Sequence, residues 1–183
     1  MDFDIALLAL RVGIGTIFVA HGLQKMFGWW GGPGWQGFKG FIAYLGPKPT
    51  VFWAAISLAG ELGGGLALIA GLLVPFAAAG LVAQTIVLLV KVHWPNGFWS
   101  PGGGVEFPIA LMVGAFAIQV LGPGAWALDA YLPVDVLYEP SVAWVILGLA
   151  VAGALVASFW PKPPPAAVAE IAEGPSTTEA APE

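Results

Sequence analysis

The sequence contains no cysteine and very little charge. Without cysteine, the chain cannot form a disulfide, a thiolate nucleophile, a cysteine-ligated metal cluster or a covalent c-type haem attachment. Charged residues make up only 9% of its 183 residues, against roughly 25% in an ordinary soluble domain. The six Lys and Arg are also too few for the clustered basic surface that nucleic acid requires. The composition therefore excludes an ordinary soluble domain and a nucleic-acid partner.

Hydrophobic residues, by contrast, make up 58% of the chain and gather in long runs. A helix needs about 20 predominantly apolar residues to cross the hydrocarbon of a bilayer. Candidate spans fall at 5–27, 51–73, 75–93, 106–121 and 141–160. We predict an all-α membrane protein with a four-helix transmembrane bundle in 1–130 and an additional C-terminal transmembrane helix in 131–160. The segment 161–183, rich in Pro, Ala and Glu, is predicted to be a disordered acidic tail.

Two connections, 28–49 and 93–105, are rich in Trp, Phe and Gly. Both follow an odd-numbered span, so they are predicted to lie at one end of the bundle as interfacial aromatic loops, with a short helix near 36–45. We call this end the aromatic cap. The positive-inside rule then predicts a cytoplasmic cap and C-terminus and an outside N-terminus, because the lysines of the connections and span ends all fall on the cap side: Lys25, Lys39, Lys48, Lys91 and Lys162.

Two ionisable residues lie deep in the predicted spans, at a cost of about 2.5–3.5 kcal/mol each on insertion scales. Glu61 is near the midplane of the second span, and Arg11 on the first span differs from it by roughly 6 Å in depth at about 1.5 Å per residue. We therefore predict an Arg11–Glu61 ion pair, with Ser57 one turn away as a further hydrogen-bond partner. The pair could be a structural clasp or a functional group.

A polar pocket is expected in the cap half of the bundle, because ionisable side chains from three spans end there. His21 and Lys25 share one face of the first span, Gln84 and Lys91 share one face of the third, and Glu106 opens the fourth. The two lysines could alternatively reach the headgroups. The predicted ligand-binding residues are His21, Gln24, Lys25, Glu61, Lys91 and Glu106; no catalytic residue and no metal site is predicted.

The ligand of this pocket is not fixed by the sequence. A quinone suits it, since Lys and His donors would meet the quinone oxygens and aromatic side chains would meet the ring. A b-type haem held by His21 and His93 is less favoured, because His93 lies at a span end beside Trp94 and Pro95. The cofactor therefore stays open, with quinone ahead of haem.

Several short motifs resemble the DoxX family of membrane proteins. They are LRVG at 10–13, HGLQKMFG at 21–28, Glu61 with a Gly pair at 63–64, GGGVEFP at 102–108, and LGPG at 121–124 followed by ALD at 127–129. The resemblance implies a four-helix protein of the bacterial cytoplasmic (inner) membrane with a link to membrane redox complexes and to quinone. It assigns no roles to its motif positions, which are Arg11, His21, Gln24, Lys25, Glu61, Glu106 and Asp129.

The leading functional hypothesis is an integral membrane subunit of a quinone-linked redox complex, with a quinone head group in the pocket on the cytoplasmic side. Such a subunit would belong to an oxidoreductase assembly without being a self-sufficient enzyme. Its partners would be the lipid bilayer and a larger membrane protein complex. One alternative is a small-anion or lipid-binding carrier. The other is a purely structural subunit that docks a larger membrane protein complex.

Overall fold

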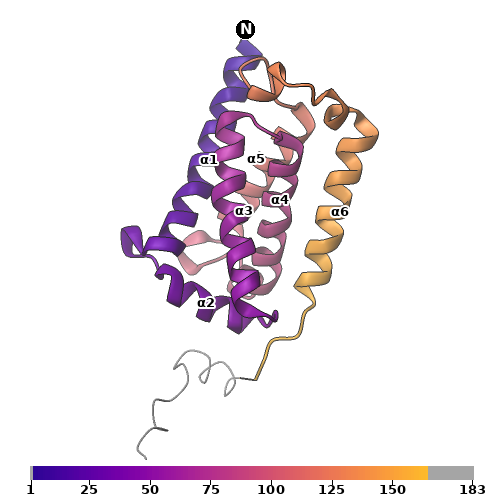
Figure 1. The fold of residues 1–183 in the computed structure, drawn as a ribbon. Coiled ribbons are helices and arrows are strands. Elements are labelled where there is room, and N and C mark those ends of the chain that lie inside the picture. The colour runs from indigo at the N-terminus through magenta and orange to yellow at the C-terminus, as the bar shows by residue number, and fades with distance from the viewer. Residues whose placement is uncertain (1, 165–183) are drawn as a thin grey trace, which may run out of the picture.

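The computed structural model describes residues 2–164, and all its long elements are helices. Within that range, the segments long and apolar enough to cross a membrane are α1 (Asp2–Phe27), α3 (Thr50–Ala70), Val74–Asn96, which begins with α4 (Val74–Leu88), and α6 (Pro140–Ser158). The apolar helix α5 (Glu106–Leu121) is shorter. Figure 1 shows α1, α3, α4 and α5 side by side, α2 (Gly34–Leu45) across the end of the bundle, and α6 to one side. The predicted all-α membrane fold is confirmed.

Helix bounds follow the apolar runs closely. α5 has the predicted limits, and the short helix predicted in the cap is α2, which buries Phe38, Ile42 and Leu45 against the bundle. α3 ends earlier than predicted, because Gly71 adopts a left-handed conformation with φ of 69° and closes the helix. α4 continues into a π-helical turn, Leu89–His93. Most of the predicted disordered tail, from residue 165 onward, lies outside the described residues.

α1 and α3 pack extensively, and two glycines bring their backbones close together. A Cβ added to Gly15 would lie 2.6 Å from the carbonyl oxygen of Gly65, and a Cβ added to Gly65 would lie 2.7 Å from that of Gly15. Further along, a Cβ added to Gly22 would lie 2.6 Å from the Leu62 side chain. In a bilayer, helices associate through such close packing rather than through hydrophobic exclusion from water. These contacts fix the register of α1 on α3.

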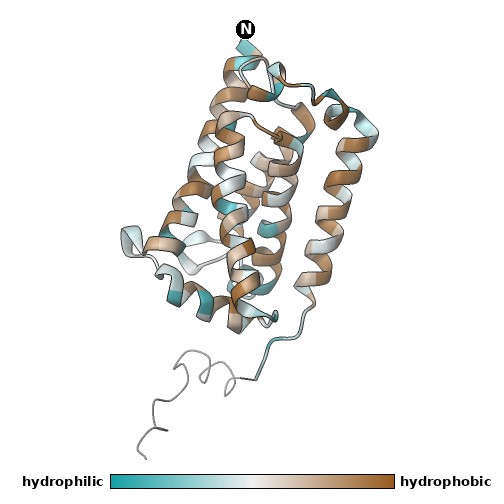
Figure 2. Cartoon of the chain, viewed as in Figure 1, coloured by the Kyte–Doolittle hydropathy of each residue, from teal (hydrophilic) through white to brown (hydrophobic). Residues whose placement is uncertain are grey.

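Large apolar side chains cover the outside of the bundle, and its centre is an apolar core of both small and large side chains. Ala78, Ala115 and Ile118 are fully buried in a core around α4, whereas Leu149 and Val156 of α6 are about 70% exposed. Figure 2 shows mainly hydrophobic colour along the long helices. Because a bilayer solvates such surfaces, this exposure is consistent with a multi-pass membrane protein. α6 packs mainly on α4.

The end of the bundle opposite the cap, here called the acidic end, is fastened by Asp129. Its carboxylate accepts hydrogen bonds from the backbone N–H groups of Leu73 (2.8 Å) and Val74 (2.9 Å) and from the Tyr138 hydroxyl. It thereby caps the N-terminus of α4, where a negative charge is favourable. Burial, together with the bond to Asp129, raises the pKa of Tyr138 above its ordinary value. The connection between α5 and α6 is thus tied to the start of α4.

Candidate functional site

A buried polar cluster joins α1, α3 and α4 in the cap half of the bundle. Lys25 forms an ion pair with Oε1 of Glu61, and the side-chain amide of Gln84 donates to the same oxygen at 2.7 Å. Glu61 is only 2% exposed. Its second oxygen, Oε2, is buried without a hydrogen-bond partner among the described residues. One carboxylate oxygen of the cluster therefore lacks a hydrogen-bond donor, in a buried region where a polar atom without a hydrogen bond costs free energy.

Local sequence makes room for this cluster. Gly60 lies on the α3 face toward α4, and a Cβ there would approach Oε1 of Gln84 to 3.1 Å. On the other side, the ammonium group of Lys25 lies 5.0 Å from the centre of the Phe38 ring of α2, within the range of a cation–π contact. The glycine admits the Gln84 amide, and the aromatic ring covers the lysine.

The predicted Arg11–Glu61 ion pair is wrong. Glu61 pairs with Lys25, while the fully buried Arg11 donates through Nη2 to the carbonyl of Trp126 at 2.7 Å. The reason is the register set by Gly15 and Gly65, which places Arg11 beside Gly71 at the far end of α3. Gly71 and Glu61 are ten residues apart, roughly 15 Å along a helix. Gln84 supplies the hydrogen bond that was expected from Ser57.

The other predicted site residues divide into two groups. His21 and Gln24 lie on α1, whereas Lys91, His93 and Glu106 contact backbone atoms in the cap. His21 lies one turn before Lys25 and packs on the Phe107 ring, with 6.0 Å between ring centres, so it stays near the cluster. Gln24 lies against the backbone at Gly32.

Lys91, Glu106 and His93 are engaged with backbone instead. The Lys91 ammonium donates to the carbonyls of Leu45 (2.6 Å) and Trp160 (2.8 Å), which end α2 and follow α6. Glu106 accepts from the N–H of Ser100 at 2.9 Å, and Nδ1 of His93 is 2.7 Å from the carbonyl oxygen of Gly103. Lys91 and Glu106 therefore brace the cap, and His93 is held by the loop before α5.

A groove of about 520 Å³ runs beside the cluster between α3 and α6. α4 forms its floor, and α2 closes its cap end. Lys25 and Gln84 line it, so the polar cluster forms part of its wall. The rest of the lining is largely apolar, with aromatic side chains from Phe38, Trp53 and Trp160. We call it the lateral groove. Sequence reasoning missed it, because nothing in the sequence places α6 opposite α3.

The fold and this site define a class: a multi-pass helical membrane protein with a buried ion pair beside an apolar lateral groove. The family model described as DoxX matches residues 6–94. Over 133 residues, the chain is 30% identical to a Bacillus subtilis (strain 168) protein named "Putative oxidoreductase CatD". The aligned residues make up 72% of this chain and 90% of that protein. The chain belongs to the DoxX family. No solved structure matches it significantly.

The family match bears directly on the site. Lys25, Glu61 and Gln84 all fall within residues 6–94. The α6 wall of the lateral groove lies beyond that range. The polar cluster thus lies within the family-matched segment.

Proposed function

We propose that this protein is a membrane subunit of a quinone-linked redox assembly and that the lateral groove holds the quinone. The observation that carries the proposal is the chemistry of the groove, whose lining is largely apolar and aromatic, with polar side chains from Lys25, Ser57, Gln84 and Lys91. A quinone has an apolar ring and two carbonyl acceptors, so it needs this combination of surfaces. The relative named as an oxidoreductase supports a redox setting.

Lys25 and Gln84 both have N–H groups left to donate to a ligand in the groove. An ammonium group has three donors and a side-chain amide has two, and Glu61 takes one from each of Lys25 and Gln84. A remaining N–H of either residue can meet a quinone oxygen. In this proposal the chain binds and orients the quinone, and the electrons come from a partner protein. His21, one turn from Lys25, stands near the same end.

The charge of the cluster favours a neutral ligand over the small anion considered from the sequence. Glu61 already neutralises Lys25, and the Lys91 ammonium is occupied by two backbone carbonyls. An anion would have to displace Glu61 or sit beside its carboxylate, at a cost in repulsion. A quinone carries no net charge and avoids this cost.

Access to the groove suits a lipid-soluble molecule. The groove lies between two helices whose outer side chains, such as Trp53 of α3 and Val156 of α6, are exposed. In a bilayer these side chains face hydrocarbon, so a quinone would enter sideways from the lipid. We further propose that the protein resides in the bacterial inner membrane with its cap in the cytoplasm. Reporter fusions after residues 49 and 123 should then give cytoplasmic and outside signals, respectively.

The test is quinone content and ligand-induced stabilisation. Full-length protein is extracted with native lipid, its quinones are measured by mass spectrometry, and thermal unfolding is followed with added quinone. Gln84→Leu, which keeps the volume and loses the donor, should reduce bound quinone about tenfold or more. The matched control is Lys39→Met, because Lys39 lies on α2 near the Trp35 ring and does not line the groove.

Other results would point to the alternatives. Wild-type protein that carries no quinone and gains no stability from added quinone would refute the proposal. Co-purification of a lipid or anion at the groove would instead favour the carrier, and a stoichiometric protein partner with an empty groove would favour the purely structural subunit.

A further inference from the structure

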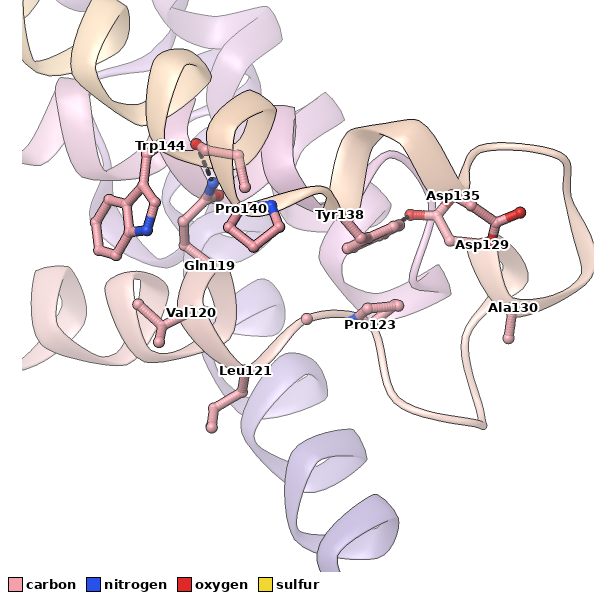
Figure 3. A pocket seen from close by; sticks show the side chains of 12 residues that line it. Gln119, Val120, Leu121, Pro123, Asp129, Ala130, Asp135, Tyr138, Pro140 and Trp144 are labelled. Carbon is pink, nitrogen blue, oxygen red and sulfur yellow. Dashed lines mark hydrogen bonds between the residues drawn. The ribbon is translucent and has the colours of Figure 1, made fainter.

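A second pocket, of about 490 Å³, lies at the acidic end, remote from the polar cluster. It lies where the last turn of α5, the connection 122–139 and the first turn of α6 meet. Figure 3 shows Gln119 of α5 rising between the Trp144 ring and Pro140 of α6, with Tyr138, Asp129 and Asp135 further along. The quinone proposal makes no use of this pocket.

One hydrogen-bond acceptor in the wall of this pocket has no donor. Gln119 is 6% exposed, and its amide nitrogen donates to the Ala143 carbonyl at 3.1 Å. Its carbonyl oxygen, Oε1, is buried without a partner in the part of the chain that the structure describes. A buried acceptor without a hydrogen bond is costly, and few are left so in folded proteins. The pocket therefore calls for a hydrogen-bond donor.

Charge decides what kind of donor fits. Asp129 and the exposed Asp135 line the pocket, and none of its described lining residues is basic. Arg11, the one basic residue in this half of the described chain, is fully buried and does not line the pocket, but it lies close enough to Asp129 to offset part of that charge. The exposed Asp135 therefore supplies the more open negative charge. A negative surrounding attracts cations and repels anions.

An aromatic face completes the site. Trp144 lines the pocket, is 55% exposed, and is held by Phe116 with 6.3 Å between ring centres. Tryptophan is the strongest aromatic partner for a cation.

We propose that this pocket binds a primary ammonium group, which offers N–H donors to Gln119 and positive charge to the carboxylates and the Trp144 ring. The group could be the headgroup of an ethanolamine lipid or a free alkylamine. A choline headgroup has the charge but no N–H donor, so it satisfies only part of the site.

The test compares these sources on the full-length protein. Thermal unfolding is measured in detergent micelles doped with phosphatidylethanolamine, phosphatidylcholine or phosphatidylglycerol, and separately with ethylammonium chloride against sodium chloride at equal ionic strength. Phosphatidylethanolamine or ethylammonium should stabilise the protein more than the other additions. Stabilisation by the lipid alone assigns the pocket to a headgroup, and stabilisation by ethylammonium as well assigns it to amines in general.

Variants of the pocket residues test whether the stabilisation arises from binding in this pocket. Gln119→Leu keeps the volume and removes the acceptor, so it should fold and weaken the response about tenfold or more. Asp135→Asn, which changes one exposed carboxylate, should weaken it less. The control Gln36→Leu, on the exposed side of α2, should respond as wild type does. Equal stabilisation by phosphatidylglycerol, or an undiminished response in Gln119→Leu, would overturn the proposal.

Discussion

Replacing either partner of the Lys25–Glu61 pair should destabilise the bundle, and by unequal amounts. Removing one partner of a buried ion pair typically costs about 3–5 kcal/mol, because the other charge stays buried. The Glu61 side chain is 3% exposed and the Lys25 side chain is 15% exposed near the cap. Lys25→Met leaves Glu61 with no route to water and should reach this range. Glu61→Gln should cost less, because the freed lysine can extend toward the headgroups.

A double-mutant cycle measures the interaction itself. The free energy of unfolding is determined for wild type, Lys25→Met, Glu61→Gln and the double variant by denaturant titration in mixed micelles, with tryptophan fluorescence as the signal. Residues in direct contact show interaction energies of about 0.5–3 kcal/mol. The double variant should therefore lose less than the sum of the two single variants by an amount in this range.

The control cycle pairs Glu61→Gln with Arg11→Met. Arg11 donates to Trp126 and lies beside Gly71 at the other end of α3, so its loss should be costly in its own right. The two losses should nevertheless add within about 0.3–0.5 kcal/mol, as they do for distant residues. Additive losses for Lys25 and Glu61, or a clear interaction between Arg11 and Glu61, would refute the assignment of the pair.

Three further outcomes are expected. Gly15→Leu should destabilise the protein by more than about 1–3 kcal/mol in thermal unfolding, since the nearest atom to the added side chain is the backbone oxygen of Gly65, which cannot move aside as a side chain can. Unchanged stability would show that α1 and α3 are not in close contact. Tyr138→Phe should be less stable than wild type at neutral pH, and the difference should shrink above pH about 10. The pKa of Tyr138 is raised in the folded state, so its contribution to stability is full below the unfolded-state pKa and is lost as the pH rises toward the folded-state pKa. A constant difference in pH-dependent unfolding would contradict this. Lys91→Met should release the carbonyls of Leu45 and Trp160 and speed limited proteolysis at the cap. Unchanged cleavage would argue against that bracing role.

The sequence predicts the helices well, because their signal is local. Apolar runs and their flanking glycines and prolines mark where each helix can cross a bilayer, and the limits of α5 agree with the prediction. The aromatic run after α1 predicts α2 in the same way. Each of these conclusions needs only neighbouring residues in the chain.

The partner of Glu61 could not be predicted in this way. Depth along a span is readable from the sequence, but the rotation and register of one helix against another depend on packing. Here that register is set by two glycine backbones, at Gly15 and Gly65, and it moves Arg11 away from Glu61. The partners of Lys91 could not be predicted from the sequence either. It was expected in the pocket or at the headgroups, and it does line the lateral groove. Its ammonium group is nevertheless held by carbonyls near the ends of α2 and α6, because helix ends leave unpaired carbonyls that attract such a group.

The position of α6 connects the family-matched segment to the proposed ligand. Lys25, Glu61 and Gln84 lie on helices within the matched residues 6–94, but α3 and α4 alone would present them on an open surface of the bundle. α6 packs on α4 and contributes side chains such as Ala154 and Ala157 to the far wall, which turns that surface into a groove. Under the proposed function, the polar cluster would recognise the quinone head group, and α6 would set the selectivity for its apolar tail. Substitutions on the groove face of α6 should then change which quinone tail is retained without disturbing the Lys25–Glu61 pair.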